Sequence, residues 1–186
     1  PPHCRVKTRR TVTWSGAEIS DAHFDGTVTS YGTHSGGLVG NNSGTITASS
    51  TSGTVEILTN LNNAGGLVGS NMVDGEIISS SSTAEVNSSG ENIGGLVGWN
   101  DGNIIESRAE GCVTASGSSR IGGLVGYNKG SIEESSAFGN VIATNESAGS
   151  IGGLVGYNES GSAITSSHSA GNVTANGQWI SVVGGL

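Results

Sequence analysis

The sequence predicts an all-β protein, a parallel β-solenoid of about six turns with roughly 29 residues in each turn. Three observations carry this prediction: a recurring pentapeptide, a composition that disfavours helices, and apolar residues that alternate with other residues. The pentapeptide GGLVG begins at five positions, at successive intervals of 29, 29, 28 and 30 residues: Gly36, Gly65, Gly94, Gly122 and Gly152. A partial copy, GGL, begins 32 residues later at Gly184.

The composition favours strands and turns and leaves too few large apolar residues for an ordinary globular core. The 186 residues include 33 glycines and 2 prolines, and aromatic residues make up only 4%. Glycine and β-branched residues are poor helix formers, and β-branched residues are common in strands. Val113 and Ala115 stand two residues apart, as do Val141 and Ala143, so each pair lies on one face of a strand. We expect each repeat to form one turn with about three short strands.

Stacking of the turns at about 4.8 Å would align equivalent apolar residues in three internal ladders. The leucines of GGLVG form the first ladder: Leu38, Leu67, Leu96, Leu124 and Leu154. Isoleucines form the second: Ile46, Ile77, Ile104, Ile132 and Ile164. Valines form the third: Val55, Val86, Val113, Val141 and Val173. We expect the glycines of GGLVG to permit close backbone approach and the backbone dihedral angles of corners.

An asparagine follows the last glycine of every complete GGLVG by two residues. These asparagines form the most regular polar column in the sequence: Asn42, Asn71, Asn100, Asn128 and Asn158. Stacked amides can form hydrogen bonds along the solenoid axis and can satisfy backbone groups at a corner. We therefore assign this column to the structure of the repeat rather than to ligand binding.

Residues 1–13 form a basic head outside the repeat pattern, and residues 14–186 form an array of repeats that is incomplete at both ends. Four of the seven basic residues lie in the head, which is interpreted as a tail or a cloning remnant: Arg5, Lys7, Arg9 and Arg10. The incomplete repeats would leave open strand edges, so end-to-end self-association is one candidate property. Cys4 and Cys112 make no metal motif, and whether they form a disulfide stays open.

Charge and hydropathy exclude two classes of partner. Beyond the head, the array carries 3 basic residues against 15 acidic ones, so it should repel nucleic acid and anionic lipid. No apolar run approaches the roughly 18 residues that a membrane-spanning helix requires, so membrane insertion is not expected.

The segment GGLVGYNKGSIEESSAFGNV, residues 122–141, and its sister copies resemble the repeat of the GLUG-motif family. The resemblance covers about residues 16–186, and five full copies share the core, the asparagine and isoleucine that follow it, and a Gly-x-Val or its variant. Members are typically secreted or cell-surface bacterial proteins, including adhesin-like proteins and the non-catalytic parts of immunoglobulin A-directed metallopeptidases. The resemblance implies an extracellular scaffold or binding role, with a host or microbial surface glycan or protein as the candidate partner.

No catalytic site, cofactor or metal is expected. Glycoside-cleaving β-helices need clustered carboxylates, whereas the four aspartates of this chain are scattered: Asp21, Asp25, Asp74 and Asp101. His23 and His168 fall in one column but about five turns, or roughly 24 Å, apart, so they cannot ligate one metal. The chain is therefore interpreted as a non-enzyme.

Two binding hypotheses come from outward columns. Trp99, Tyr127 and Tyr157 would form an aromatic stripe, a candidate surface for stacking against sugar rings, although mutual packing is the favoured interpretation. Two alternative functions are ice binding and service as the subunit of a self-assembling filament. Ice binding requires a regular outward array of threonines. The column after the valine ladder is too mixed for such an array: Thr29, Glu56, Asn87, Thr114, Ile142 and Thr174.

A charged column provides a test of the alignment. Asp101, Lys129 and Glu159 each lie three residues after the last glycine of their GGLVG, so stacking should place Lys129 between two carboxylates. We expect exposed ion pairs here, each contributing about 0–1 kcal/mol.

Overall fold

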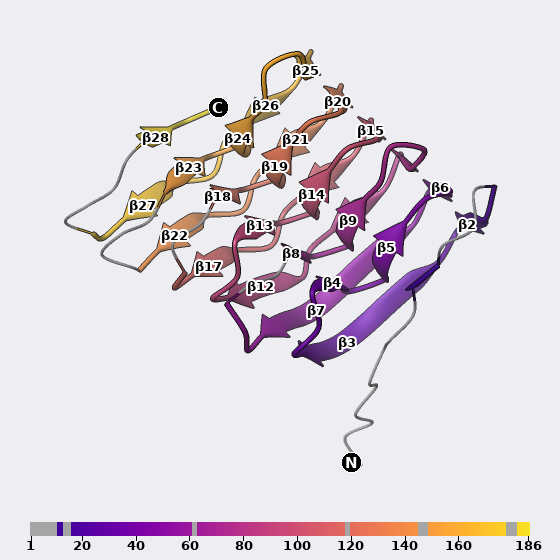
Figure 1. Cartoon of the computed structure of the whole chain (residues 1–186), viewed down its shortest axis with the longest axis horizontal. Helices are drawn as coiled ribbons and strands as arrows, with labels where there is room; N and C mark the ends of the chain where they lie inside the picture. Colours follow the sequence, from indigo (N-terminus) through magenta and orange to yellow (C-terminus); the bar gives the residue numbers. More distant parts are fainter. Residues whose placement is uncertain (1–10, 13–15, 61–62, 118–119, 145–148, 178–181) are drawn as a thin grey trace.

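The structure is a computed structural model that describes residues 11–12, 16–60, 63–117, 120–144, 149–177 and 182–186. The described residues form short β-strands without any helix, and therefore without a helix of the length and apolar character needed to span a bilayer. Successive turns lie side by side from the first strands to the C-terminus (Figure 1). Strands of neighbouring turns pair in parallel, for example Trp99 with Tyr127 and Asn100 with Asn128. The parallel β-solenoid with about 29 residues per turn is thus confirmed.

The strands form four parallel sheets, which we call A to D, that run along the solenoid. Sheet A contains β1 (Thr11–Val12), β5 (Val39–Asn42), β9 (Val68–Asn71), β14 (Val97–Asn100), β19 (Val125–Asn128) and β24 (Val155–Asn158). Sheet B contains β2 (Glu18–Ser20), β6 (Thr45–Thr47), β10 (Glu76–Ile78), β15 (Asn103–Ile105), β20 (Ser131–Glu133) and β25 (Ala163–Thr165). Sheet B follows sheet A along the chain in every turn.

Sheets C and D complete each turn. Sheet C begins with the long strands β3 (His23–Ser30) and β7 (Ser50–Ile57). Later turns supply two short strands each: β11 (Ser81–Ser82), β12 (Glu85–Ser88), β16 (Arg108–Ala109), β17 (Val113–Ala115), β21 (Ser136–Ala137), β22 (Val141–Ala143), β26 (His168–Ser169) and β27 (Val173–Ala175). Sheet D contains β4 (His34–Gly36), β8 (Asn63–Gly65), β13 (Asn92–Gly94), β18 (Arg120–Gly122), β23 (Ser150–Gly152) and β28 (Val182–Gly184).

The expected six turns and three strands per turn need correction. The structure has about five turns, because the first partial copy lacks a GGLVG and the last contributes only β28 to sheet D. Each turn has four walls, because the two residues before GGLVG and its first glycine form sheet D, and the rest of the pentapeptide then turns the chain into sheet A. The inward position of sheet D forms a further ladder: Ser35, Ala64, Ile93, Ile121 and Ile151.

The predicted apolar ladders fill the interior. Leu67, Leu96, Leu124 and Leu154 are fully buried, whereas Leu38 in the first complete turn is partly buried. In the isoleucine and valine ladders the first four members are buried, and the last members, Ile164 and Val173, are only partly buried. Burial of these side chains replaces a globular core, because each turn packs its apolar face against the turns on both sides.

The glycines of GGLVG are required by close contact and not by the dihedral angles of corners. A Cβ on Gly98 would lie 2.6 Å from the nitrogen of Ala64, so sheets A and D approach too closely for a side chain. The left-handed corner between sheets B and C is occupied by other residues, with φ between 48° and 51°: Asp21, Ala48, Ser79, Glu106, Glu134 and Ser166. The expectation of close approach is correct, and the expectation about corner dihedral angles is wrong.

A serine ladder follows this corner: Ser49, Ser80, Ser107, Ser135 and Ser167. The Ser107 hydroxyl donates to the carbonyl of Ile105 at 2.8 Å and accepts from the backbone N–H of Ser80 at 3.1 Å. Each serine thus satisfies backbone groups in its own turn and in the preceding turn. The sequence does carry a signal for this ladder, which is a serine three residues after every ladder isoleucine.

Truncation of a central ladder leucine should destabilise the solenoid more than truncation of a terminal one. We expect Leu124→Ala to lower the free energy of unfolding by about 2–5 kcal/mol, because Leu124 is fully buried between two turns. Leu38→Ala should cost clearly less, because Leu38 is only partly buried. Denaturant unfolding of both variants measures the difference, and equal losses would contradict the stacking of turns along one dimension.

Candidate functional site

The aromatic residues of sheet A form one stack in consecutive turns. Strand pairing aligns Trp99 with Tyr127 and Tyr127 with Tyr157. The ring centroids of Trp99 and Tyr127 are 4.2 Å apart, and those of Tyr127 and Tyr157 are 5.4 Å apart, with nearly parallel planes. The ring faces therefore cover one another, and Tyr127 is only 9% exposed. This geometry favours mutual packing over a flat surface for sugar rings.

A cation and a carboxylate surround the stack. The Arg120 guanidinium carbon lies 4.8 Å from the ring centroid of Tyr127 and 5.5 Å from that of Tyr157, within the range of cation–π attraction. The Tyr127 hydroxyl donates a hydrogen bond to Glu159. That hydrogen bond, loss of solvent around the ring and the negative charge of Glu159 together raise the pKa of Tyr127 from 10.0 to about 12. The stack is therefore a clamp between turns that is held by three kinds of contact.

Ionisation of Tyr127 should weaken the fold at alkaline pH. The folded-state pKa of about 12 lies above the ordinary value of 10.0, so this stabilisation is complete below pH 10 and disappears between about pH 10 and 12. Subtracting the phenolate absorbance titration of Tyr127→Phe from that of the unaltered chain isolates the Tyr127 titration. Glu159→Ala should return its midpoint towards 10, and a midpoint near 10 in the unaltered chain would disprove the role of Glu159.

Polar residues continue this clamp into the earlier turns, where the aromatic column is interrupted. A hydrogen bond of 2.7 Å joins His34 Nδ1 to Ser70 Oγ, and Asn63 Nδ2 donates to the same hydroxyl at 2.8 Å. Asn92 donates to Asn63 at 2.8 Å, and Arg120 donates to Asn92 at 3.1 Å. Loss of solvent around the ring lowers the pKa of His34. The outward column of sheet D thus links His34 to the aromatic stack.

The asparagine column forms a continuous amide ladder. Side-chain amides donate to the oxygen of the next asparagine at 2.7–2.8 Å, through all five residues: Asn42, Asn71, Asn100, Asn128 and Asn158. The Asn100 amide also donates to the carbonyl of Gly102 at 3.1 Å, which holds the chain at the end of sheet A. The first four asparagines are buried, whereas Asn158 is exposed. The arrangement supports a structural role.

Removal of a central amide should break the ladder on both sides. Asn100→Ala leaves the Asn71 amide and the Asn128 oxygen without their ladder partner in a buried place, so we expect a loss of about 1–3 kcal/mol in the free energy of unfolding. Asn158→Ala is the matched control at the exposed end and should cost less than half as much. Thermal and denaturant unfolding measure both, and equal costs would argue against a cooperative ladder.

The ion pairs expected around Lys129 are absent from the described residues. Asp101, Lys129 and Glu159 do share one column, because their backbone N–H groups bond to Asn71, Asn100 and Asn128 respectively. The prediction of alignment is therefore correct, and the prediction of ion pairing is wrong. The Glu159 carboxylate accepts from the Tyr127 hydroxyl instead. An exposed ion pair is too weak to displace a charge-assisted hydrogen bond to a packed ring.

Within the described part of the chain, no group of three or more histidine, cysteine, aspartate or glutamate side chains is placed to hold a metal ion. Strand pairing puts His23 and His168 in one column of sheet C, at its two ends. Cys112 is half-buried before β17, while Cys4 and most of the basic head lie outside the described residues. The described Thr11–Val12 pairs with β5 as an additional strand of sheet A.

The column expected after the valine ladder lies on the outer face of sheet C, in the predicted order. Its members pair turn by turn: Thr29, Glu56, Asn87, Thr114, Ile142 and Thr174. A carboxylate, an amide and an isoleucine thus interrupt the threonines. The face is therefore irregular in chemistry although it is regular in spacing.

Comparison with known proteins agrees with the repeat geometry. The family model described as the GLUG motif matches residues 117–142 and 147–174. These two segments are GLUG motifs. The matched GLUG segments contain the strands of two consecutive turns, which pair in register with one another and with the turns before them. No curated protein and no solved structure matches the chain in the other two comparisons. The chain is a repeat scaffold with the form of a β-solenoid.

Proposed function

We propose that this chain is a non-catalytic, extracellular segment of an adhesin-like bacterial surface protein, where it acts as a stalk or presents a ligand-binding face. The observation that carries the proposal is the unbroken parallel pairing of all four sheets along the solenoid (Figure 1). Such pairing gives a stiff rod whose length grows by one strand spacing, about 4.8 Å, per turn. A rod of this kind suits a spacer at a cell surface.

The interior supports this proposal because it is occupied by structural ladders. Leucine, isoleucine and valine ladders fill the core, and buried asparagine and serine ladders satisfy the polar groups between them. Within the described turns, the leucine and isoleucine ladders pack in one apolar cluster, and the valine ladder packs in a second with the inward residues of sheet D, so side chains fill the interior where a buried substrate would have to bind. Recognition by the solenoid would therefore use its outer columns.

An ice-binding solenoid is supported less well. Ice binding calls for repeated threonines at matched positions, whereas Glu56, Asn87 and Ile142 interrupt the outward column of sheet C. The irregular chemistry of this column suits a specific partner better than the regular lattice of ice.

Surface labelling tests the proposed location. Antibodies raised against the 186-residue chain are applied to intact and to permeabilised cells that produce the full-length protein, with a cytoplasmic protein as the control. We expect equal labelling of intact and permeabilised cells, and loss of the epitope when intact cells are treated with protease. Labelling that requires permeabilisation would overturn the extracellular assignment.

A further inference from the structure

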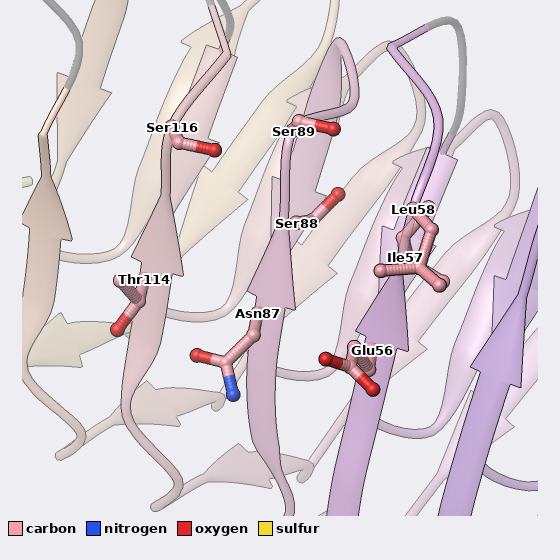
Figure 2. A pocket seen from close by; sticks show the side chains of 8 residues that line it. All are labelled: Glu56, Ile57, Leu58, Asn87, Ser88, Ser89, Thr114 and Ser116. Atoms are coloured by element: carbon pink, nitrogen blue, oxygen red, sulfur yellow. The ribbon is translucent and has the colours of Figure 1, made fainter.

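The outer face of sheet C carries a groove at the ends of β7, β12 and β17. Its volume is about 310 Å³, and neighbouring turns line it. Figure 2 shows Glu56, Asn87 and Thr114 in a row across the three strands, with Leu58 and Ser116 nearer the strand ends. The groove therefore runs across the turns, along the solenoid axis.

The row consists of residues that strand pairing holds in register. Asn87 pairs with Glu56 on one side and with Thr114 on the other, so the three side chains repeat at the spacing between turns. Their side chains form no hydrogen bond or ion pair with other described residues. Elsewhere on this face polar groups pair internally, as Ser52 does with Asp25 at 2.7 Å and Arg108 with Glu110 at 3.0 Å.

The chemistry of the groove fits a compound with many hydroxyl groups. The Glu56 carboxylate accepts hydrogen bonds, and the Asn87 amide and Thr114 hydroxyl both donate and accept. Leu58, 46% exposed, offers an apolar surface for the C–H face of a sugar ring. Turns repeat at about 4.8 Å, which is close to the length of one pyranose unit, so consecutive sugars would meet consecutive turns.

Charge narrows the choice of ligand. Glu56 and the acidic array around it repel sugars with carboxylate or sulfate groups. A metal ion fits poorly, because Glu56 is the single carboxylate among the described residues that line the groove. The unpaired hydrogen-bonding groups and the exposed leucine therefore favour a neutral, hydroxyl-rich ligand.

We propose that this groove binds a neutral oligosaccharide laid along the solenoid axis, with Glu56, Asn87 and Thr114 contacting successive sugar units. The proposal deepens, and rests on, the proposed role as a ligand-presenting segment. It assigns recognition to sheet C and leaves the aromatic stack of sheet A as a structural clamp.

A printed array of neutral and anionic oligosaccharides from bacteria, plants and animals provides the probe, and the strongest neutral binder is then titrated against variants. We expect Thr114→Val and Glu56→Gln each to weaken binding by about tenfold, because each removes a hydrogen-bonding group or its charge. Two matched controls lie outside the groove: Thr174→Val, in the same column, and Glu85→Gln, on the same strand as Asn87. Both should bind as the unaltered chain does, and circular dichroism confirms folding of all four variants.

Each outcome decides the proposal. Neutral-glycan binding that is lost in the groove variants and kept in the controls supports it. A blank array, binding to anionic glycans alone, or equal binding by groove and control variants overturns it. The glycan array tests the groove and the surface labelling tests the extracellular location. Either proposal can therefore be overturned without overturning the other.

Discussion

Parallel pairing of each turn with the next, residue on equivalent residue, is the constraint on which the rest of this structure depends. Backbone hydrogen bonds hold every turn one strand spacing from its neighbours, so each side chain meets copies of its own position above and below. Additional residues must therefore leave the stack. The turn after Asn71 has two more residues before sheet B than the turn after Asn100, and Met72 and Val73 lie exposed there while Glu76 still pairs with Asn103.

A column of identical residues is stable only if each side chain can pack against, or form hydrogen bonds beside, a copy of itself in the next turn. Leucine and isoleucine satisfy this condition by burial, and asparagine and serine satisfy it because each both donates and accepts hydrogen bonds. A buried column of carboxylates would fail, since each charge would repel the next. The same logic explains the aromatic stack, in which Trp99, Tyr127 and Tyr157 use their faces on one another. The interior therefore contains residue types that tolerate a copy of themselves in the next turn along the solenoid axis.

The sequence predicts the structural features that follow from the repeat period. It predicts few of the features that depend on competition between neighbouring side chains. The spacing of GGLVG alone predicts that Trp99 lies against Tyr127 and that Asn100 aligns with Asn128, because strict stacking turns sequence position into spatial position. The fourth wall is harder to predict, since Ile121 immediately precedes GGLVG and the sequence does not mark it as a separate ladder. The partner of Glu159 is not predictable from the period, because the choice between Lys129 and the Tyr127 hydroxyl depends on side-chain packing.

The division between inner and outer columns also limits where function can evolve in such a scaffold. A substitution at Leu124 or Asn100 disturbs two neighbouring turns, since each is packed or bonded on both sides. A substitution at Thr114 changes one outward group and leaves the backbone pairing of β17 intact. Specificity can therefore be assembled turn by turn on an outer wall without cost to the core. One column of sheet C shows such variation, because glutamate, asparagine and isoleucine replace threonine in some of the turns. The outer wall of sheet C, rather than the aromatic stack, is therefore the face on which recognition can vary.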